Sequence, residues 1–322
     1  MPEGHTLHRL AHTLDRAFAG TTPRVTSPQG RFVAGAALLD GRACEGAQAW
    51  GKHLFVTFVG ERILNVHLGL IGVFDVLRYA AGPGLAVPAP PAVGAVRMRL
   101  LTDEWVADLR GATVVEVVTP EQQAATLARL GPDPLRAGEP GQDPARSLAK
   151  LARTDRSIAE LLMDQSVLAG VGNVYRCEVL HRHRVAPFTP GRLVKASTWL
   201  ELWDDLVDLM PLGVAFGQII TLPEQVEEAQ ALLAPVRADG EAQASGEPAA
   251  YVVDWQGGAE GERGRGRGRS KRPAYEVVSP LPREYAVYKR TGEPCPRCGA
   301  RVRSQVVAGR TLYWCGRCQR RR

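Results

Sequence analysis

The sequence predicts an α+β fold in which an antiparallel β-sandwich with flanking helices precedes a helical region that ends in a four-cysteine β-hairpin. Three observations support this fold class. Short β-branched or alternating segments, separated by Gly, Pro, Asp and Glu, fill most of the first third of the chain, which is typical of antiparallel sandwiches and barrels. Helical periodicities follow, and two CxxC pairs lie near the end. A chain of 322 residues is long enough for two domains with separate cores.

The first predicted helix begins with residues that also carry a chemical signal. Proline suits a first helical turn and an acid favours the positive end of the dipole, so helix initiation alone accounts for Pro2 and Glu3. The alternative is catalytic, because removal of Met1 would leave Pro2 with a secondary amine that titrates near about 7.7–8.0. Such an amine can form a Schiff base while Glu3 moves protons. The helix is marked by an apolar stripe of Leu7, Leu10, Ala11, Leu14 and Phe18.

The predicted sandwich follows this helix. Val25–Val33 and Gly41–Ala49 are short segments punctuated by turns, and Gly82–Val93 is predicted to be a long loop. Between and after them lie six predicted strands: His53–Val59, Ile63–Leu68, Gly72–Leu77, Ala95–Leu101, Trp105–Leu109 and Thr113–Val118.

From Pro120 onward the pattern becomes helical, and it divides the rest of the chain. We expect a first domain over residues 1–130, a linker over 131–146, a helical domain over 147–222, a largely disordered insert over 223–282 and a terminal hairpin over 283–322. The predicted helices are Glu121–Leu130, Ser147–Ala152, Ser157–Met163, Val174–His183 and Thr198–Met210.

Composition and charge indicate a globular protein with a basic end. Hydrophobic residues make up 45% and charged residues 23%, no apolar run is long enough to span a membrane, and the acidic start does not resemble a secretory signal. We therefore expect a cytoplasmic, nucleoid-associated protein. Residues 263–322 hold 17 Lys/Arg against 3 Asp/Glu, which favours a polyanionic partner. The run RGRGRGRSKR over 263–272 fits a flexible linker and an arginine-rich tether equally well.

The four paired cysteines predict a metal site. Two CxxC units separated by 16 residues match a tetrahedral zinc site, which is closed by four thiolates and therefore structural. A β-hairpin with Arg310 at its tip is predicted between the two units. Zinc ribbons also act as folding staples or protein-docking modules, but the surrounding arginines favour nucleic acid. The predicted ligands are Cys295, Cys298, Cys315 and Cys318, whereas Cys44 and Cys177 are expected to fill apolar cores.

The segment DQSVLAGVGNVY over residues 164–175 forms a second signal. A helix is expected to end near Leu168, two glycines to make a tight turn, and a new helix to begin near Asn173. The amides of that helix N-terminus and the Asn173 side chain can bind a phosphate, although an ordinary helical hairpin fits the pattern equally well.

Four motifs in order carry a family resemblance. MPEG at the start, WGKH over 50–53, DQSVLAGVGNVY, and the terminal CPRCG…GRTLYWCGRCQ together resemble the formamidopyrimidine-DNA glycosylase/endonuclease VIII family, specifically its endonuclease VIII branch. The resemblance covers residues 1–222 and about 283–322. It implies a two-layer β-sandwich followed by a helix–two-turns–helix domain that carries the zinc finger.

The resemblance also implies roles for individual residues. Pro2 would attack the deoxyribose C1′ and release the damaged base, and Glu3 would act as general acid and base at the sugar. Lys52 would assist β-elimination, while Arg310 would hold phosphate and support δ-elimination. Asn173 would bind the DNA backbone.

Further residues are candidates for contact with DNA. In this family a loop supplies a wedge that fills the space left by a flipped nucleotide, and here Leu70 fits that role, although sandwich core is an equal alternative for Leu70 and Ile71. His67 could touch phosphate or lie in the core, and Arg176 is a further candidate for DNA binding. Relatives often have Pro-Glu where this chain has His5-Thr6, so a second acid near the nucleophile is missing.

These inferences combine into one functional hypothesis. We expect a monomeric bifunctional DNA glycosylase/AP lyase that removes oxidised bases, pyrimidines in preference, from damaged double-stranded DNA, with one structural Zn²⁺ and no membrane partner. An oxidised-purine glycosylase and a non-catalytic damaged-DNA-binding protein on the same scaffold are the alternatives.

Overall fold

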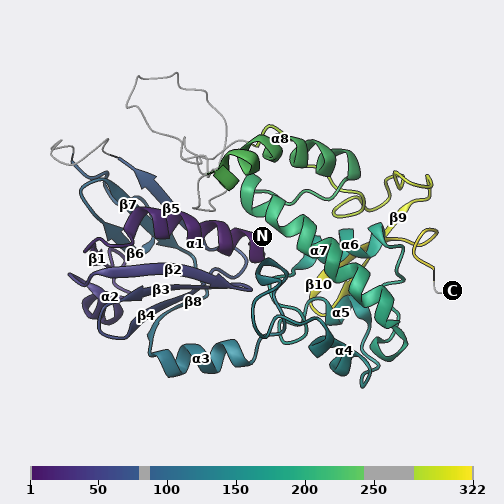
Figure 1. Ribbon diagram of the computed structural model, residues 1–322, viewed down its shortest axis with the longest axis horizontal. Helices are drawn as coiled ribbons and strands as arrows, with labels where there is room; N and C mark the ends of the chain where they lie inside the picture. The colour runs from purple at the N-terminus through teal and green to yellow at the C-terminus, as the bar shows by residue number, and fades with distance from the viewer. Residues whose placement is uncertain (1, 80–87, 243–278, 321–322) are drawn as a thin grey trace.

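The computed structural model describes residues 2–79, 88–242 and 279–320. Two halves meet around the start of the first helix, with a β-sandwich on one side and a helical region with a small hairpin on the other (Figure 1). Among the described helices, none combines the length and apolar character that a membrane span needs.

The N-terminal half consists of two four-stranded antiparallel sheets, as the sequence predicts (Figure 1). The strand order is β1-β6-β7-β5 in one sheet and β2-β3-β4-β8 in the other, and all six predicted strands are confirmed to within one or two residues. The bounds are β1 Arg24–Thr26, β2 Cys44–Trp50, β3 His53–Phe58, β4 Arg62–His67, β5 Val73–Arg78, β6 Val96–Leu101, β7 Trp105–Arg110 and β8 Val114–Val118.

Helix α1 (Gly4–Phe18) packs its predicted apolar stripe into the sandwich core, where Leu14 and Phe18 are fully buried beside Phe58 and Met98. A short helix α2 (Val33–Leu39) was not predicted from the sequence. Its seven residues are Val, Ala, Gly and Leu without a polar face, so no helical periodicity marks it, and burial of Leu39 decides its conformation.

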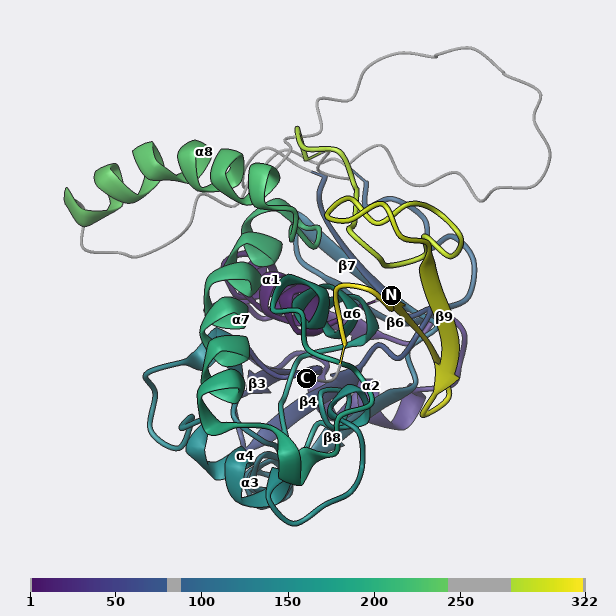
Figure 2. The same ribbon diagram turned by 90° about the vertical axis from the view of Figure 1, so that its right-hand side faces the viewer.

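The C-terminal half is built around α6 (Asn173–Arg182), whose residues from Asn173 to His181 are all buried. Helix α7 (Ala196–Phe216) covers one side of α6 and the hairpin of β9 (Val302–Val307) and β10 (Arg310–Cys315) covers another (Figure 2). The remaining elements are α3 Pro120–Ala128, η1 Pro134–Arg136, α4 Ala145–Leu151, α5 Ile158–Leu161, η2 Gly191–Leu193 and α8 Pro223–Ala242.

Three expectations about the helical half are corrected by the structure. Helix α7 runs through Pro211 instead of ending at Met210, because burial of Leu209, Met210 and Leu212 outweighs the roughly 3 kcal/mol that an internal proline costs. The largely disordered insert predicted over residues 223–282 is wrong as far as Ala242, since α8 occupies Pro223–Ala242, a stretch rich in Ala, Glu and Gln, which favour helix. The arginine-rich run 263–272 lies outside the described residues.

The third correction concerns the turn that follows the first helices of this half. Helix α5 ends at Leu161 rather than near Leu168, and turns fill the chain from there to α6. Residues 131–134, which the sequence places in a linker, are buried against both halves. The packing of α7 against η1 and α1 accounts for this burial.

Candidate active site

The N-terminus of α6 holds the carboxylate of Glu3. Glu3 is fully buried, and it accepts hydrogen bonds from Gly172 N at 2.8 Å, Val174 N at 2.8 Å and Tyr175 N at 3.5 Å. The amides and the helix dipole both favour an anion at this place. These amides are therefore occupied, which corrects the expectation that they are free for a phosphate.

Glycines make this close approach possible. A Cβ on Gly172 would lie 2.4 Å from Glu3 Cδ, so a larger residue would displace the carboxylate. One residue along, Gly4 N donates to Gly170 O at 2.7 Å. The turn before α6 thereby fixes the backbone on both sides of Glu3.

The same turn holds Lys52, which lies between β2 and β3. Lys52 Nζ donates to Val171 O at 2.7 Å. Gly51 before it has φ +58°, and a Cβ there would lie 3.0 Å from Ala169 Cβ and 3.1 Å from Gly170 N. Residues 169–172 therefore bring together two parts of the sandwich, the N-terminus and the β2–β3 turn, that are almost fifty residues apart.

Burial favours the uncharged forms of Glu3 and Lys52. Desolvation raises the pKa of Glu3, although the Lys52 charge and the three backbone amides oppose this shift. Desolvation lowers the pKa of Lys52, with Glu3 opposing and the charges of Arg310 and Arg176 adding to the effect. A carboxyl group and an amine whose charged forms are both disfavoured by burial are candidates for proton transfer to and from a substrate.

A large cleft between the two halves adjoins this site. Its volume is about 1960 Å³, which exceeds the roughly 300–1,000 Å³ of a small-molecule pocket and suits part of a macromolecule. Pro2, His5, Leu70, Ile71 and Tyr285 all line it. Leu70 is 49% and Ile71 81% exposed, so the alternative that these two residues form sandwich core is wrong. Exposed apolar side chains on a cleft wall fit a wedge.

His5 and Thr6 stand where relatives often have Pro-Glu, so Thr6 replaces the second acid and His5 precedes it. Burial, followed by the charge of the N-terminal amine, lowers the pKa of His5 to about 3, so its ring is neutral at physiological pH. Its Nε2 lies 3.2 Å from Thr6 Oγ1, and its ring meets Tyr175 edge-on at 5.6 Å. Glu3 is therefore the acid that this part of the chain contributes to the site.

Asn173 and Arg176 point into the protein. Asn173 Nδ2 donates to Thr311 O on β10 at 2.9 Å, and Arg176 donates to Asn173 Oδ1 and to Ala159 O. Arg176 is completely buried, so in this conformation it supports Asn173 and does not face the cleft. Arg310 begins β10 directly after the Ala308-Gly309 turn, within electrostatic range of Lys52 and Arg176.

His67 lies at the end of β4, half-buried before the β4–β5 loop that carries Leu70. Its ring meets that of His53 at 5.3 Å, and its Nδ1 accepts from Gly69 N at 3.2 Å. Desolvation, with the charges of His53 and Lys52, lowers the pKa of His67.

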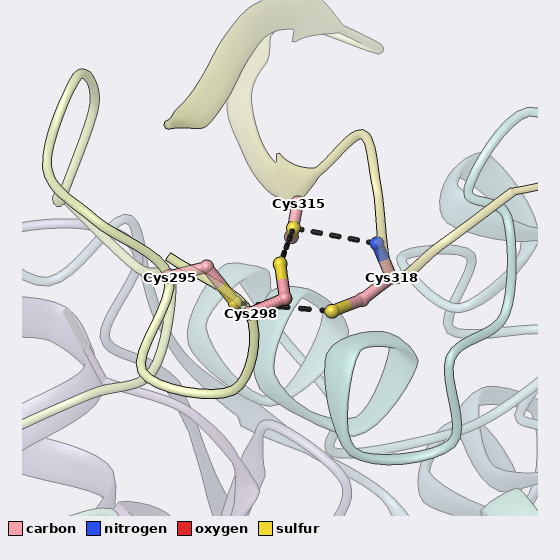
Figure 3. A group of neighbouring side chains, drawn as sticks. All are labelled: Cys295, Cys298, Cys315 and Cys318. Atoms are coloured by element: carbon pink, nitrogen blue, oxygen red, sulfur yellow. Dashed lines mark hydrogen bonds between the residues drawn. The ribbon is translucent and has the colours of Figure 1, made fainter. Parts of the chain in front are cut away.

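The four predicted cysteine ligands converge at the base of the hairpin (Figure 3). All four Sγ atoms lie within 4.8 Å of one another, with Cys295–Cys318 at 3.9 Å and Cys298–Cys315 at 3.5 Å. Zn–S bonds of about 2.3 Å in a tetrahedron require sulfur atoms roughly 3.8 Å apart, so the site fits zinc. His181 Nε2 lies 3.3 Å from Cys295 Sγ and supports this ligand from α6.

Sequence reasoning missed several residues that shape the site. Glu178 is fully buried and anchors the chain leading to the zinc hairpin, whose Tyr285 and Tyr288 line the cleft. Asp133 is 1% exposed, and its Oδ2 accepts from Gly51 N at 2.7 Å and pairs with His8 Nε2 at 2.9 Å. The GPDP motif around Asp133 indicated only a helix stop, and an acid inside the apolar pattern of α6 was the one available signal for Glu178.

Comparison with known proteins places the chain in a family. Residues 1–117 match the formamidopyrimidine-DNA glycosylase N-terminal domain, residues 130–224 the formamidopyrimidine-DNA glycosylase H2TH domain, and residues 292–321 a zinc finger found in FPG and IleRS. Endonuclease 8 1 of Mycobacterium tuberculosis (strain ATCC 25618 / H37Rv) is 40% identical over 319 residues, which cover 99% of this chain and 100% of that protein. The chain belongs to the formamidopyrimidine-DNA glycosylase/endonuclease VIII family.

Other members of the formamidopyrimidine-DNA glycosylase/endonuclease VIII family are more distant. Formamidopyrimidine-DNA glycosylase of Geotalea uraniireducens (strain Rf4) is 27% identical over 282 residues, covering 88% of this chain and 84% of that protein. A solved complex of Lactococcus lactis Fpg with DNA containing an abasic site shares the fold, with a TM-score of 0.68 at 19% identity over 99% of this chain and 100% of that chain.

Membership in this family sets the class of the enzyme. The protein is a DNA glycosylase with AP lyase activity that acts in the repair of oxidised bases. Its terminal domain is the family's zinc finger and holds one structural Zn²⁺ through the four cysteines.

Proposed function

We propose that this enzyme removes oxidised pyrimidines from duplex DNA by attack of the Pro2 amine on C1′ of the damaged nucleotide, followed by β,δ-elimination. One observation carries the proposal: the buried carboxylate of Glu3 and the amine of Lys52 meet on a single turn beside a cleft that Pro2 lines. In this scheme Met1 is removed, the new N–C1′ bond replaces the N-glycosidic bond, and the base leaves with a proton.

Each candidate residue has a place in this scheme. Glu3, whose pKa is raised, protonates the sugar ring oxygen as the iminium ion forms, and later takes the proton back. In the β-elimination a proton leaves C2′ as the C3′–O bond breaks and the 3′ phosphate departs, and Lys52, whose pKa is lowered, assists this step. In the δ-elimination a proton leaves C4′ as the C5′–O bond breaks and the 5′ phosphate departs, while Arg310 holds phosphate. Hydrolysis of the remaining iminium ion frees Pro2.

We propose that the enzyme binds DNA as a monomer through both halves. Leu70 is the wedge that enters the duplex, because it is exposed on the cleft wall in the middle of the β4–β5 loop. His67 and Arg310 contact the phosphate backbone. Asn173 reaches phosphate from the start of α6 when DNA displaces its bond to Thr311 O, and Arg176 holds it in place.

The preference for pyrimidines rests on the relatives. The endonuclease 8 relative matches at 40% identity over the whole chain, whereas the formamidopyrimidine-DNA glycosylase relative matches at 27%. The second candidate, an oxidised-purine glycosylase, is supported by the family models, which carry that enzyme's name. Incision of duplexes containing thymine glycol should exceed incision of duplexes containing 8-oxoguanine, and the reverse order would favour the second candidate.

Borohydride trapping on abasic-site DNA tests the nucleophile. The wild-type protein should form a covalent adduct, whereas Pro2→Gly should form much less and a variant with one extra residue before Pro2 should form none. Equal trapping by the extended variant would mean that another amine reacts. Tight binding to abasic DNA without adduct or incision would indicate the non-catalytic alternative.

A further inference from the structure

We propose that Asp133 and Arg136, on the segment that joins the two halves, are positioning residues that hold the Lys52 turn and the Pro2 helix in register. This inference rests on the proposed roles of Lys52 and Pro2. The segment, residues 131–136, contains the 3-10 helix η1, and none of its residues lines the cleft.

Three consecutive residues before Lys52 are each held from this segment. Arg136 Nη1 donates to Ala49 O at 2.9 Å, and its guanidinium lies over the Trp50 ring at 3.6 Å from the ring centroid. Asp133 accepts from Gly51 N at 2.7 Å. The Ala49 carbonyl, the Trp50 ring and the Gly51 amide are thus each held in place. The backbone immediately before Lys52 therefore has little conformational freedom.

The carboxylate of Asp133 also reaches the helix that carries the proposed nucleophile. The oxygen that accepts from Gly51 N also pairs with His8 Nε2 on α1 at 2.9 Å, and the other oxygen accepts from Leu135 N at 3.0 Å. Helix α1 begins directly after Pro2 and Glu3. Asp133 is 1% exposed. Its Oδ2 is therefore a buried acceptor that the two elements supplying Pro2 and Lys52 share.

Position alone can have a large effect on rate. A displacement of about 1 Å in a catalytic group can lower a rate on the order of 100-fold. Lys52 has a flexible four-carbon stem, and its amine donates to Val171 O at 2.7 Å, so the position of its backbone must be set by neighbouring segments. Asp133 and Arg136 do this from a segment that lies beside the 169–172 turn, where Ala169 N donates to Pro132 O at 3.0 Å.

The test compares single-turnover incision rates at an abasic site, the step that Lys52 is proposed to assist, with dissociation constants for DNA that carries a tetrahydrofuran abasic analogue. We expect Arg136→Met to incise about 10-fold more slowly and Asp133→Asn about 10- to 100-fold more slowly, each with DNA affinity within about 2-fold of wild type. Arg136→Lys should recover part of the rate, because a lysine keeps the cation over Trp50. Glu139→Gln breaks only the exposed ion pair of Arg136, and Asp143→Asn alters a local helix cap, so both should match wild type.

A double-mutant cycle separates positioning from general stability. If Arg136 acts through Lys52, Arg136→Met should lower the rate less than 2-fold when Lys52→Ala is already present. An equal loss in both backgrounds, or a loss confined to DNA affinity, would overturn the proposal. If Asp133→Asn has a Tm well below that of wild type, its slower rate could reflect lost stability. The double-mutant cycle of Arg136→Met with Lys52→Ala then decides between positioning and stability. Full trapping by Pro2→Gly, in contrast, would reject the proposed function. The effect of Arg136→Met on the incision rate would still be measured, and it would decide the positioning role by itself.

Discussion

The buried carboxylate of Glu178 joins helix α6 to the chain that leads into the zinc finger, and its removal should loosen that connection. Its Oε1 accepts from Val287 N and Tyr288 N at 2.9 Å each, and its Oε2 accepts from Ala286 N at 2.8 Å and Thr221 Oγ1 at 3.1 Å. Helix α6 thereby grips the chain that leads into the zinc finger.

The loss in free energy of unfolding can be calculated from the hydrogen-bond donors that lose their acceptor when Glu178 is replaced. Glu178→Ala would leave three buried amides without partners, and at about 1 kcal/mol or more for each amide the loss should be roughly 3–5 kcal/mol. Glu178→Gln keeps one acceptor oxygen for Val287 and Tyr288 and loses the bond from Ala286, so it should cost about 1–3 kcal/mol. These losses correspond to a fall in Tm of roughly 2–4 °C per kcal/mol.

The pH dependence has a definite sign. Desolvation raises the folded-state pKa of Glu178 above its unfolded value, against the four hydrogen bonds. Stability from this group is therefore fully present below the unfolded pKa and declines as pH rises through the folded pKa. Glutamine does not titrate, so the stability gap between wild type and Glu178→Gln should narrow as pH rises above about 4.5.

Two measurements check this prediction. Thermal unfolding between pH 5 and 9 gives the stability gap, and hydrogen exchange at Ala286, Val287 and Tyr288 reports the local loss. Glu201→Gln is a matched control, because Glu201 is exposed on α7. Unchanged exchange at the three amides in Glu178→Ala, or a gap that widens with pH, would refute the reasoning.

Three further predictions concern the glycine turn, the zinc and the DNA contacts. Gly172→Ala should lower incision about 100-fold or more with zinc retained, since its Cβ would lie 2.4 Å from Glu3 Cδ; an activity near wild type would show that Glu3 tolerates displacement. His181→Phe should release zinc to a chromogenic chelator about 10-fold faster, because the contact to Cys295 Sγ is lost, and an unchanged release rate would exclude this support. Arg310→Ala should reduce the slope of log affinity against log salt by about 0.9, on damaged and undamaged DNA alike; an unchanged slope would argue against a phosphate contact.

The amino-acid sequence by itself determined the local secondary structure and the residues that belong to recognisable motifs. Alternation and turn residues located the six strands, apolar spacing located α1 on its buried face, and cysteine spacing specified the zinc ligands. These features depend on neighbours along the chain, so a single sequence records them directly.

The tertiary structure alone decided how distant groups share a site. No local pattern shows that the amides of α6 bind Glu3, that Asp133 joins α1 to the Lys52 turn, or that Glu178 holds the lead into the zinc finger. A buried carboxylate needs hydrogen-bond donors to offset its desolvation, and the fold supplies donors from distant segments, 82 residues away for Gly51 N to Asp133 and 169 residues away for Gly172 N to Glu3. The same burial that makes these contacts necessary also shifts the pKa of Glu3 and of Lys52, because water is excluded only when both halves close around them.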